Sequence, residues 1–167
     1  MGPINARIAP GECLSVMGPS GCGKSTLLNF LAGTLPAAFA ASGRVWVGGT
    51  DLTPLPPEQR GAGILFQDDL LFPHLSVGGN LAFALPASVR PAAARHSRID
   101  AALAECGLAG FARRDPATLS GGQRARVALM RTLLAAPRVL LLDEPFSQLD
   151  TRLRSDFRQW VFGHARR

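Results

Sequence analysis

The sequence has no tyrosine, and Lys24 is the single lysine among its 18 lysine and arginine residues. Its three cysteines, Cys13, Cys22 and Cys106, are odd in number and lack metal-ligand spacing, so we expect reduced thiols rather than a disulfide scaffold. No apolar run approaches the roughly 20 residues that a membrane helix needs. The first residues lack the charged start and apolar block of a secretory signal. These absences argue against secreted disulfide-rich and membrane-spanning proteins.

Charged residues are also sparse, at 18% of the 167 residues, while apolar residues make up 47%. This balance is typical of one globular domain with a buried core. The formal net charge of +6 would suit a nucleic-acid or anionic-membrane partner. However, the arginines are scattered singly or in pairs, without a run of five like charges. We therefore interpret the charge as a feature of the overall amino-acid composition and expect no nucleic-acid partner.

Apolar periodicity divides the chain into alternating strands and helices. The patterns predict strands within 13–18, 43–49, 61–67 and 138–145, and helices within 24–35, 78–86, 92–107, 119–137 and 151–167. The nearly continuous apolar run at 138–145 is typical of a strand covered on both faces in a parallel sheet. The alternation predicts an α/β fold, with residues 68–119 as a helical insertion between its two parts.

The stretch MGPSGCGKST, residues 17–26, fits the phosphate-binding pattern G-x-x-x-x-G-K-S. It follows a predicted strand and opens a predicted helix, which is the context that this loop requires. Its glycines allow backbone N–H groups to surround a β-phosphate, and the helix N-terminus adds partial positive charge. Lys24 is expected to reach the β- and γ-phosphates, and Ser25 to ligate Mg²⁺. The predicted nucleotide-binding residues are Gly18, Pro19, Ser20, Gly21, Cys22, Gly23, Lys24, Ser25 and Thr26.

The single lysine stands where the side-chain geometry excludes arginine. Arginine is a wide planar fork, whereas an ammonium is a compact charge on a flexible stem that fits inside a ring of amides. A chain that otherwise uses arginine throughout has lysine at this position.

The segment RVLLLDE, residues 138–144, supplies the second half of a hydrolytic site. A buried strand that ends in Asp143 places a carboxylate beside Mg²⁺, usually through water. Glu144 follows at the mouth of the strand, where it could orient and deprotonate an attacking water. An apolar run ending in DE is often only the edge of a core, and these two motifs together would also suit a GTPase or a small-molecule kinase.

The third motif, LSGGQ at Leu119–Gln123, stands ahead of a predicted helix, and here the sequence resembles the ATP-binding cassette ATPases. The resemblance implies ATP and Mg²⁺ as ligands, a P-loop NTPase core, and a head-to-tail homodimer with two sandwiched nucleotides. It also implies that the signature residues of one subunit close on the γ-phosphate held by the other. Those signature residues are Ser120, Gly121, Gly122 and Gln123.

Further positions extend the resemblance from about Gly11 to about Arg154. Gln67 resembles the Q-loop glutamine, a catalytic-site residue that senses Mg²⁺ and links the core to the helical subdomain. Asp150, in SQLD, resembles the D-loop aspartate of the dimer interface. The resemblance implies Glu144 and Gln67 as catalytic residues, and Ser25, Gln67 and Asp143 around Mg²⁺. It implies a P-loop core at 1–67 and 120–167 and a helical subdomain at 68–119 of one nucleotide-binding domain.

The segment LFPHLSVGGNLAFAL, residues 71–85, resembles ATP-binding subunits of bacterial binding-protein-dependent importers. That resemblance implies integral-membrane permease partners, indirectly a solute-binding protein, and a peripheral place on the cytoplasmic face of the inner membrane. A loop or helix-cap role is expected for His74. A soluble mechanical ATPase acting on nucleic acid or ribosomes is the alternative, but the coiled coils and zinc insertions of such proteins are missing between Gln67 and Ser120.

Two family features have no counterpart in the sequence. We find no adenine-stacking aromatic residue ahead of the P-loop and no switch histidine after the D-loop, because His164 falls too early and in a predicted helix. We therefore expect a cassette cut at both ends. A further alternative is a nucleotide-binding remnant that binds ATP weakly and hydrolyses it poorly alone.

Overall fold

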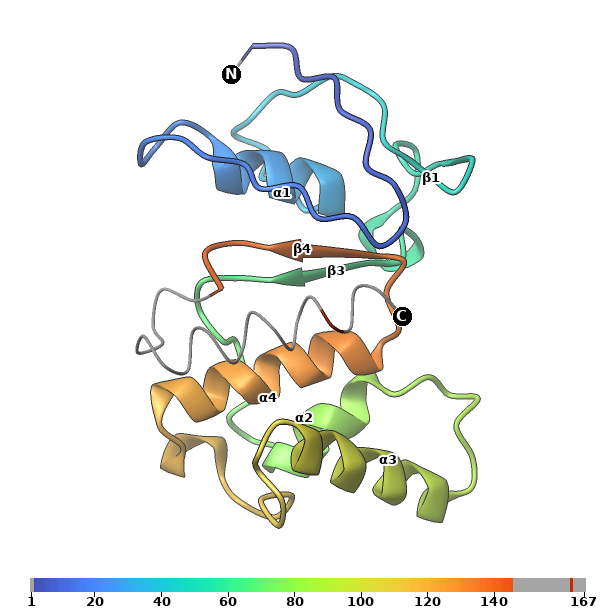
Figure 1. Ribbon diagram of the computed structural model, residues 1–167, viewed down its shortest axis with the longest axis vertical. Helices are drawn as coiled ribbons and strands as arrows, with labels where there is room; N and C mark the ends of the chain where they lie inside the picture. Colours follow the sequence, from blue (N-terminus) through green and yellow to red (C-terminus); the bar gives the residue numbers. More distant parts are fainter. Residues whose placement is uncertain (1, 146–162, 164–167) are drawn as a thin grey trace. The chain divides into compact units, whose positions relative to one another are not determined.

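The computed structural model describes residues 2–145 and 163 (Figure 1). The described residues form two compact units, which divide after Ala62. The predicted helix at 151–167 lies outside the described residues, apart from Gly163. No helix within the described ranges is long and apolar enough to cross a membrane.

The first unit is organised around helix α1, Lys24–Ala32, which confirms the helix predicted at 24–35. The helix ends at Gly33, whose φ of 83° is in the left-handed region that favours glycine, and the Gly33 N–H bonds to carbonyls of the last turn. Two short strands, β1 (Trp46–Val47) and β2 (Thr50–Asp51), form an antiparallel hairpin in this unit. A 3₁₀ turn, η1 (Pro57–Gln59), occupies the proline-rich stretch that follows.

The predicted strand at 13–18 is wrong, since no strand forms there. Leu14 is 53% exposed and Met17 is 89% exposed, so the segment is not buried either. An apolar run can favour extended backbone, but a strand exists only when a neighbour completes its hydrogen-bond ladder. The strand predicted at 43–49 is confirmed only for two residues, because the glycines at 48 and 49, both with positive φ, turn the chain back as a hairpin.

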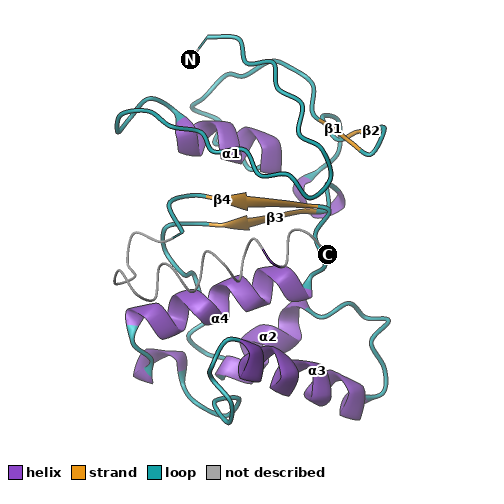
Figure 2. Ribbon diagram, viewed as in Figure 1, coloured by secondary structure: helices purple, strands orange, loops and turns teal. Residues whose placement is uncertain are grey.

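Apart from Ala62, which lies at the division, the second unit contains the two-stranded sheet of β3 (Ala62–Leu65) and β4 (Val139–Leu142), whose arrows run in the same direction (Figure 2). Both strands were predicted. Helix α4, Gly121–Leu134, leads into β4 and packs against α2 (Val77–Ala84) and α3 (Ala92–Glu105). A second 3₁₀ turn, η2 (Pro116–Thr118), precedes α4. The expectation of a strand covered on both faces is met only in part, since Leu141 is the one buried residue of β4.

The core of this unit lies between its three helices. Its largest fully buried side chains are Val77, Asn80, Leu81, Leu103, Leu108, Val127 and Leu129. The helix predicted within 92–107 is confirmed, and Ile99 and Leu103 of α3 and its C-cap Cys106 are all buried. Helix α2 comes so close to the chain beyond α3 that a Cβ on Gly78 would lie 2.9 Å from the Ala112 carbonyl oxygen, which explains glycine at this position.

Candidate functional site

The phosphate-binding pattern forms a tight loop in the first unit. The Lys24 Nζ atom donates hydrogen bonds to the carbonyl oxygens of Gly18 and Pro19, both at 3.0 Å. The Cys22 N–H donates to the Pro19 carbonyl at 3.3 Å and closes a turn inside the loop. Gly21 has a φ of 78°, a conformation that glycine adopts without steric cost. The loop therefore folds around the ammonium group of Lys24.

The N-terminus of α1 has the properties of an anion site. Its N-cap, Gly23, has a φ of 98°, and no described side chain caps the helix. The first turn contains no acidic residue. Its free N–H groups and the positive end of the helix dipole therefore face the loop without a competing carboxylate. This arrangement fits a phosphate chain.

Ser25 lies in that first turn, and its side chain is exposed, so its hydroxyl is accessible to a cation. Within the described residues, no three His, Cys, Asp or Glu side chains are grouped to hold a metal ion. Mg²⁺ does not need such a group, because it is commonly held by one or two protein oxygens together with substrate phosphates and water. The residues of this loop fit a cation that arrives with a nucleotide.

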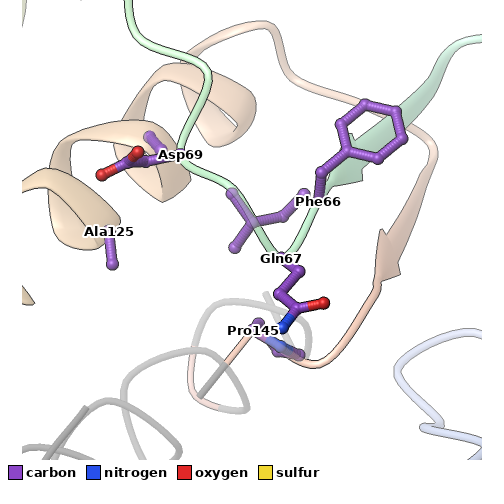
Figure 3. A pocket seen from close by; sticks show the side chains of 7 residues that line it. Phe66, Gln67, Asp69, Ala125 and Pro145 are labelled. Atoms are coloured by element: carbon purple, nitrogen blue, oxygen red, sulfur yellow. The ribbon is translucent and has the colours of Figure 1, made fainter. Parts of the chain in front are cut away.

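The carboxyl ends of β3 and β4 place three predicted residues at one edge of the second unit's sheet. The Asp143 N–H donates to the Leu65 carbonyl at 2.9 Å, so the strand pairing continues to Asp143. Gln67 follows β3 by two residues, and Figure 3 shows its side chain pointing toward Pro145 across a shared pocket. Glu144 is exposed and has a φ of 47°. A non-glycine residue in this region is strained, and such strain concentrates at functional sites.

The LSGGQ motif forms the start of α4. Ser120 is the N-cap, and its Oγ accepts from the Gln123 N–H at 3.3 Å. The Gln123 Oε1 accepts in return from the Ser120 N–H at 3.0 Å, which completes a capping box. Leu119 is buried and anchors the motif. The helix predicted within 119–137 is confirmed, and the cap fixes the positions of Gly121 and Gly122, which follow Ser120.

Two arginines of α4 reach the segment after Gln67, and sequence reasoning missed both. Arg124 Nε donates to Asp69 Oδ2 at 2.8 Å, and its Nη1 donates to the Leu119 carbonyl at 2.9 Å. Arg131 Nη1 donates to the Leu70 carbonyl at 2.9 Å. Burial lowers the pKa of Arg131, and the Asp69 carboxylate opposes that effect. The signal in the sequence was their spacing of seven residues, which places both on one helix face.

Asn80 was also missed, and it organises the loop between Gln67 and α2. Its side chain is fully buried. Its Oδ1 accepts from the Phe72 N–H at 2.8 Å, and its Nδ2 donates to the carbonyls of Phe72, Leu75 and Ser76. The His74 ring lies 5.9 Å from the Phe72 ring and is exposed, in keeping with the loop role expected for it.

The predicted site residues thus fall into two groups. Residues 18–26 form one site in the first unit, while Gln67, Asp143, Glu144 and the signature residues belong to the second. Asp150 and His164 lie outside the described residues.

Comparisons with known proteins identify the family of the chain. The model of the ABC transporter family matches residues 1–147. The chain is 53% identical to the uncharacterized ABC transporter ATP-binding protein YnjD of Escherichia coli (strain K12), over 98% of this chain and 75% of that protein. It is 48% identical to the sulfate/thiosulfate import ATP-binding protein CysA of Gloeobacter violaceus, over 95% of this chain. It spans 45% of the length of that CysA, so it corresponds to less than half of some relatives.

A solved structure gives the same fold. The ATP-binding cassette MJ0796, described as a dimeric post-hydrolysis state bound to ADP and Pi, superposes with a TM-score of 0.81 at 30% identity. The superposition covers 95% of this chain and 71% of that one. The predicted α/β P-loop fold is therefore confirmed, and this chain belongs to the ABC transporter family of ATP-binding proteins.

Proposed function

We propose that the chain binds MgATP through residues 18–26 and hydrolyses it as the ATP-binding subunit of an importer. The observation that carries the proposal is the placement of the Lys24 ammonium inside the loop, beside an N-terminus of α1 that no described side chain caps. A β- and γ-phosphate at this position would meet the ammonium, the free N–H groups and the helix dipole together.

The other predicted site residues take the roles that the chemistry requires. Ser25 and Gln67 would hold Mg²⁺ through side-chain oxygen atoms, and Asp143 would assist through water. The Glu144 carboxylate accepts a proton from the attacking water as the water oxygen bonds to the γ-phosphorus and the bond to the ADP oxygen breaks. The products are ADP and phosphate. Mg²⁺ neutralises charge on the phosphates when it is bound.

The signature residues complete the ATP site of a second copy of the chain. In this arrangement, Ser120, Gly121, Gly122 and Gln123 of one subunit contact the γ-phosphate held by the other, and Asp150 lies at the interface. The capping box supports the proposal because it fixes the start of α4. In domain terms, residues 1–67 and 120–167 form the P-loop core, and residues 68–119 form the helical subdomain.

The partners that we propose follow from the relatives. Their names specify import of sulfate or thiosulfate, of 2-aminoethylphosphonate and of Fe(3+) ions. We propose two permease subunits, an indirect link to a solute-binding protein, and a peripheral location on the cytoplasmic face of the inner membrane. These names favour import over a mechanical ATPase that acts on nucleic acid or ribosomes. Membrane association that depends on a co-expressed permease would separate the two.

The decisive experiment is calorimetric titration of the chain with MgATP. Lys24→Ala removes the ammonium, and we expect affinity to fall at least tenfold, which corresponds to about 1.4 kcal/mol. Arg98→Ala is the control, because Arg98 is an exposed residue of α3, and it should bind as the wild type does. Unchanged affinity in Lys24→Ala would overturn the proposal.

A second variant separates binding from hydrolysis. Glu144→Gln keeps the size of the side chain but cannot accept the proton, so it should bind MgATP normally. Its hydrolysis, measured as released phosphate, should fall by about 10²–10⁴-fold. Hydrolysis at the wild-type rate would remove Glu144 from the role of general base.

A further inference from the structure

Helix α4 holds the chain beyond Gln67 at two points, seven residues apart on one helix face. Arg124 forms an ion pair with Asp69, with 2.8 Å between Nε and Oδ2. Arg131 donates to the carbonyl oxygens of Leu70 at 2.9 Å and of Asp69 at 3.4 Å. Figure 3 shows the Asp69 side chain directed toward the helix that carries Ala125. Residues 69–70 are therefore attached to the helix that begins with the signature motif.

The rigid guanidinium group of Arg124 contacts both the segment after Gln67 and the signature motif. Its guanidinium bonds to Asp69 through Nε and to the carbonyl of Leu119, the first signature residue, through Nη1. The guanidinium is planar, with its donors in fixed directions, so these two contacts set the position of Asp69 relative to Leu119. Lysine, with one flexible ammonium, would not impose this geometry.

The backbone at Leu70 indicates that this attachment imposes a conformation. Leu70 has a φ of 43°, in the left-handed region that non-glycine residues rarely adopt. Its side chain is 56% exposed, so apolar burial does not hold it there. Arg131 donates a hydrogen bond to the carbonyl oxygen of this strained residue. Strain of this kind persists where surrounding contacts determine the backbone.

We propose that Asp69 and Arg124 are positioning residues that couple the Gln67 segment to the signature motif. The inference rests on the proposed function, in which Gln67 serves the subunit's own ATP and residues 120–123 serve the ATP of the partner. A shift of residues 67–70 on nucleotide binding then moves the first turn of α4 with it. The two ATP sites of a dimer are linked in this way through each subunit.

The exposure of the pair indicates that its role is positional. The side chains of Arg124 and Asp69 are 36% and 23% exposed, and partly exposed ion pairs add little to stability. Loss of the pair should therefore leave the fold and the P-loop intact while it uncouples the two segments.

The first test is amide hydrogen exchange of the full chain without nucleotide. Asp69→Ala and Arg124→Ala should each raise exchange in both segments, residues 67–71 and 119–124, by roughly fivefold. The double charge reversal, Asp69→Arg with Arg124→Asp, should restore part of the protection. Arg98→Asp, an exposed charge reversal on α3, is the control and should change neither segment. A change confined to the segment that carries the substitution would overturn the proposal.

The second test uses the Glu144→Gln background and measures MgATP-dependent dimer formation by light scattering. Each single variant should weaken dimer association by roughly fivefold without changing monomer affinity for ATP, and the charge reversal should recover part of it. Equal association in all variants would overturn the coupling. If the parent binds no MgATP, the proposed function fails instead, and the exchange experiment alone decides the coupling. If Asp69→Ala does not fold, Arg124→Lys, which keeps the charge and loses the fork, takes its place.

Discussion

Arg60 and Gly33 depend on each other in the first unit. Arg60 is only 8% exposed, and its guanidinium donates to the carbonyls of Phe30 and Leu31, in the last turn of α1, and to those of Leu55 and Thr53. A Cβ on Gly33 would lie 2.6 Å from the Arg60 Nε atom. These contacts satisfy the end of the helix whose other end forms the proposed phosphate site.

Gly33→Ala should therefore destabilise the chain through two effects, the positive φ and the collision with Arg60. We expect the free energy of unfolding, measured with urea, to fall by about 2–3 kcal/mol. Gly49→Ala is the matched control, since Gly49 has a φ of 81° and no atom within 4 Å of the added Cβ. It should lose only the conformational part, about 1 kcal/mol. Equal losses in the two variants would show that Arg60 moves aside.

The buried thiol of Cys106 should make the free energy of unfolding depend on pH. Burial raises the pKa of its thiol from 9.0 to about 11, and the Arg126 guanidinium opposes that shift. Because the folded protein binds this proton more tightly than the unfolded chain, the stabilisation is complete below pH 9.0 and is lost as the pH rises to about 11. In that window the free energy of unfolding should fall less steeply with pH in Cys106→Ala than in the wild type. Cys13→Ala, at an exposed cysteine, should retain the wild-type slope.

Among the secondary-structure elements, α4 carries both a structural cap and a predicted binding surface at its N-terminus. Ser120 serves the cap through its Oγ, and the same residue is proposed to face the partner's γ-phosphate. Two substitutions separate these roles. Ser120→Ala removes the cap acceptor, whereas Ser120→Asp keeps an acceptor and adds a negative charge.

Ser120→Ala should reduce the unfolding free energy by about 1 kcal/mol, while Ser120→Asp should stay close to the wild type. Ser120→Asp should nevertheless prevent MgATP-dependent dimer formation, because its carboxylate repels the phosphate. Denaturant unfolding and light scattering measure the two effects on the same samples. A Ser120→Asp chain that dimerises normally would contradict the role proposed for the signature residues.

For the whole molecule, the central prediction is that each ATP site contains parts of two chains. Lys24→Ala lacks a working P-loop, and Ser120→Asp lacks a working signature. Mixed in the Glu144→Gln background, they should form hybrid dimers in which one site joins the intact P-loop of one chain to the intact signature of the other. Labelled ATP retained on the dimer should appear in the mixture and not with either variant alone. No retention in the mixture would mean that each chain builds its own site.

Much of the element structure could be predicted from the sequence because the signals are local. The glycines of residues 18–23 specify a loop, and Ser120 with Gln123 specifies a helix start through bonds three residues apart. Apolar periodicity identified α3 for the same reason. The segment at 13–18 was predicted wrongly because its strand character depended on a neighbour that its own residues do not specify.

The sequence by itself determined the glycine-rich turn at 18–23, the capping box of α4 and the family, since these depend on residues close together in the chain and on backbone conformations that few residue types allow. The tertiary structure alone decided that Asp69 meets Arg124, that Arg60 closes the end of α1, and that Asn80 holds the loop before α2. Asp69 and Arg124 are 55 positions apart, and Arg60 and Phe30 are 30 apart. Contacts of that range form only after packing has brought distant segments together, and no local pattern encodes which side chains will then lie within hydrogen-bond distance.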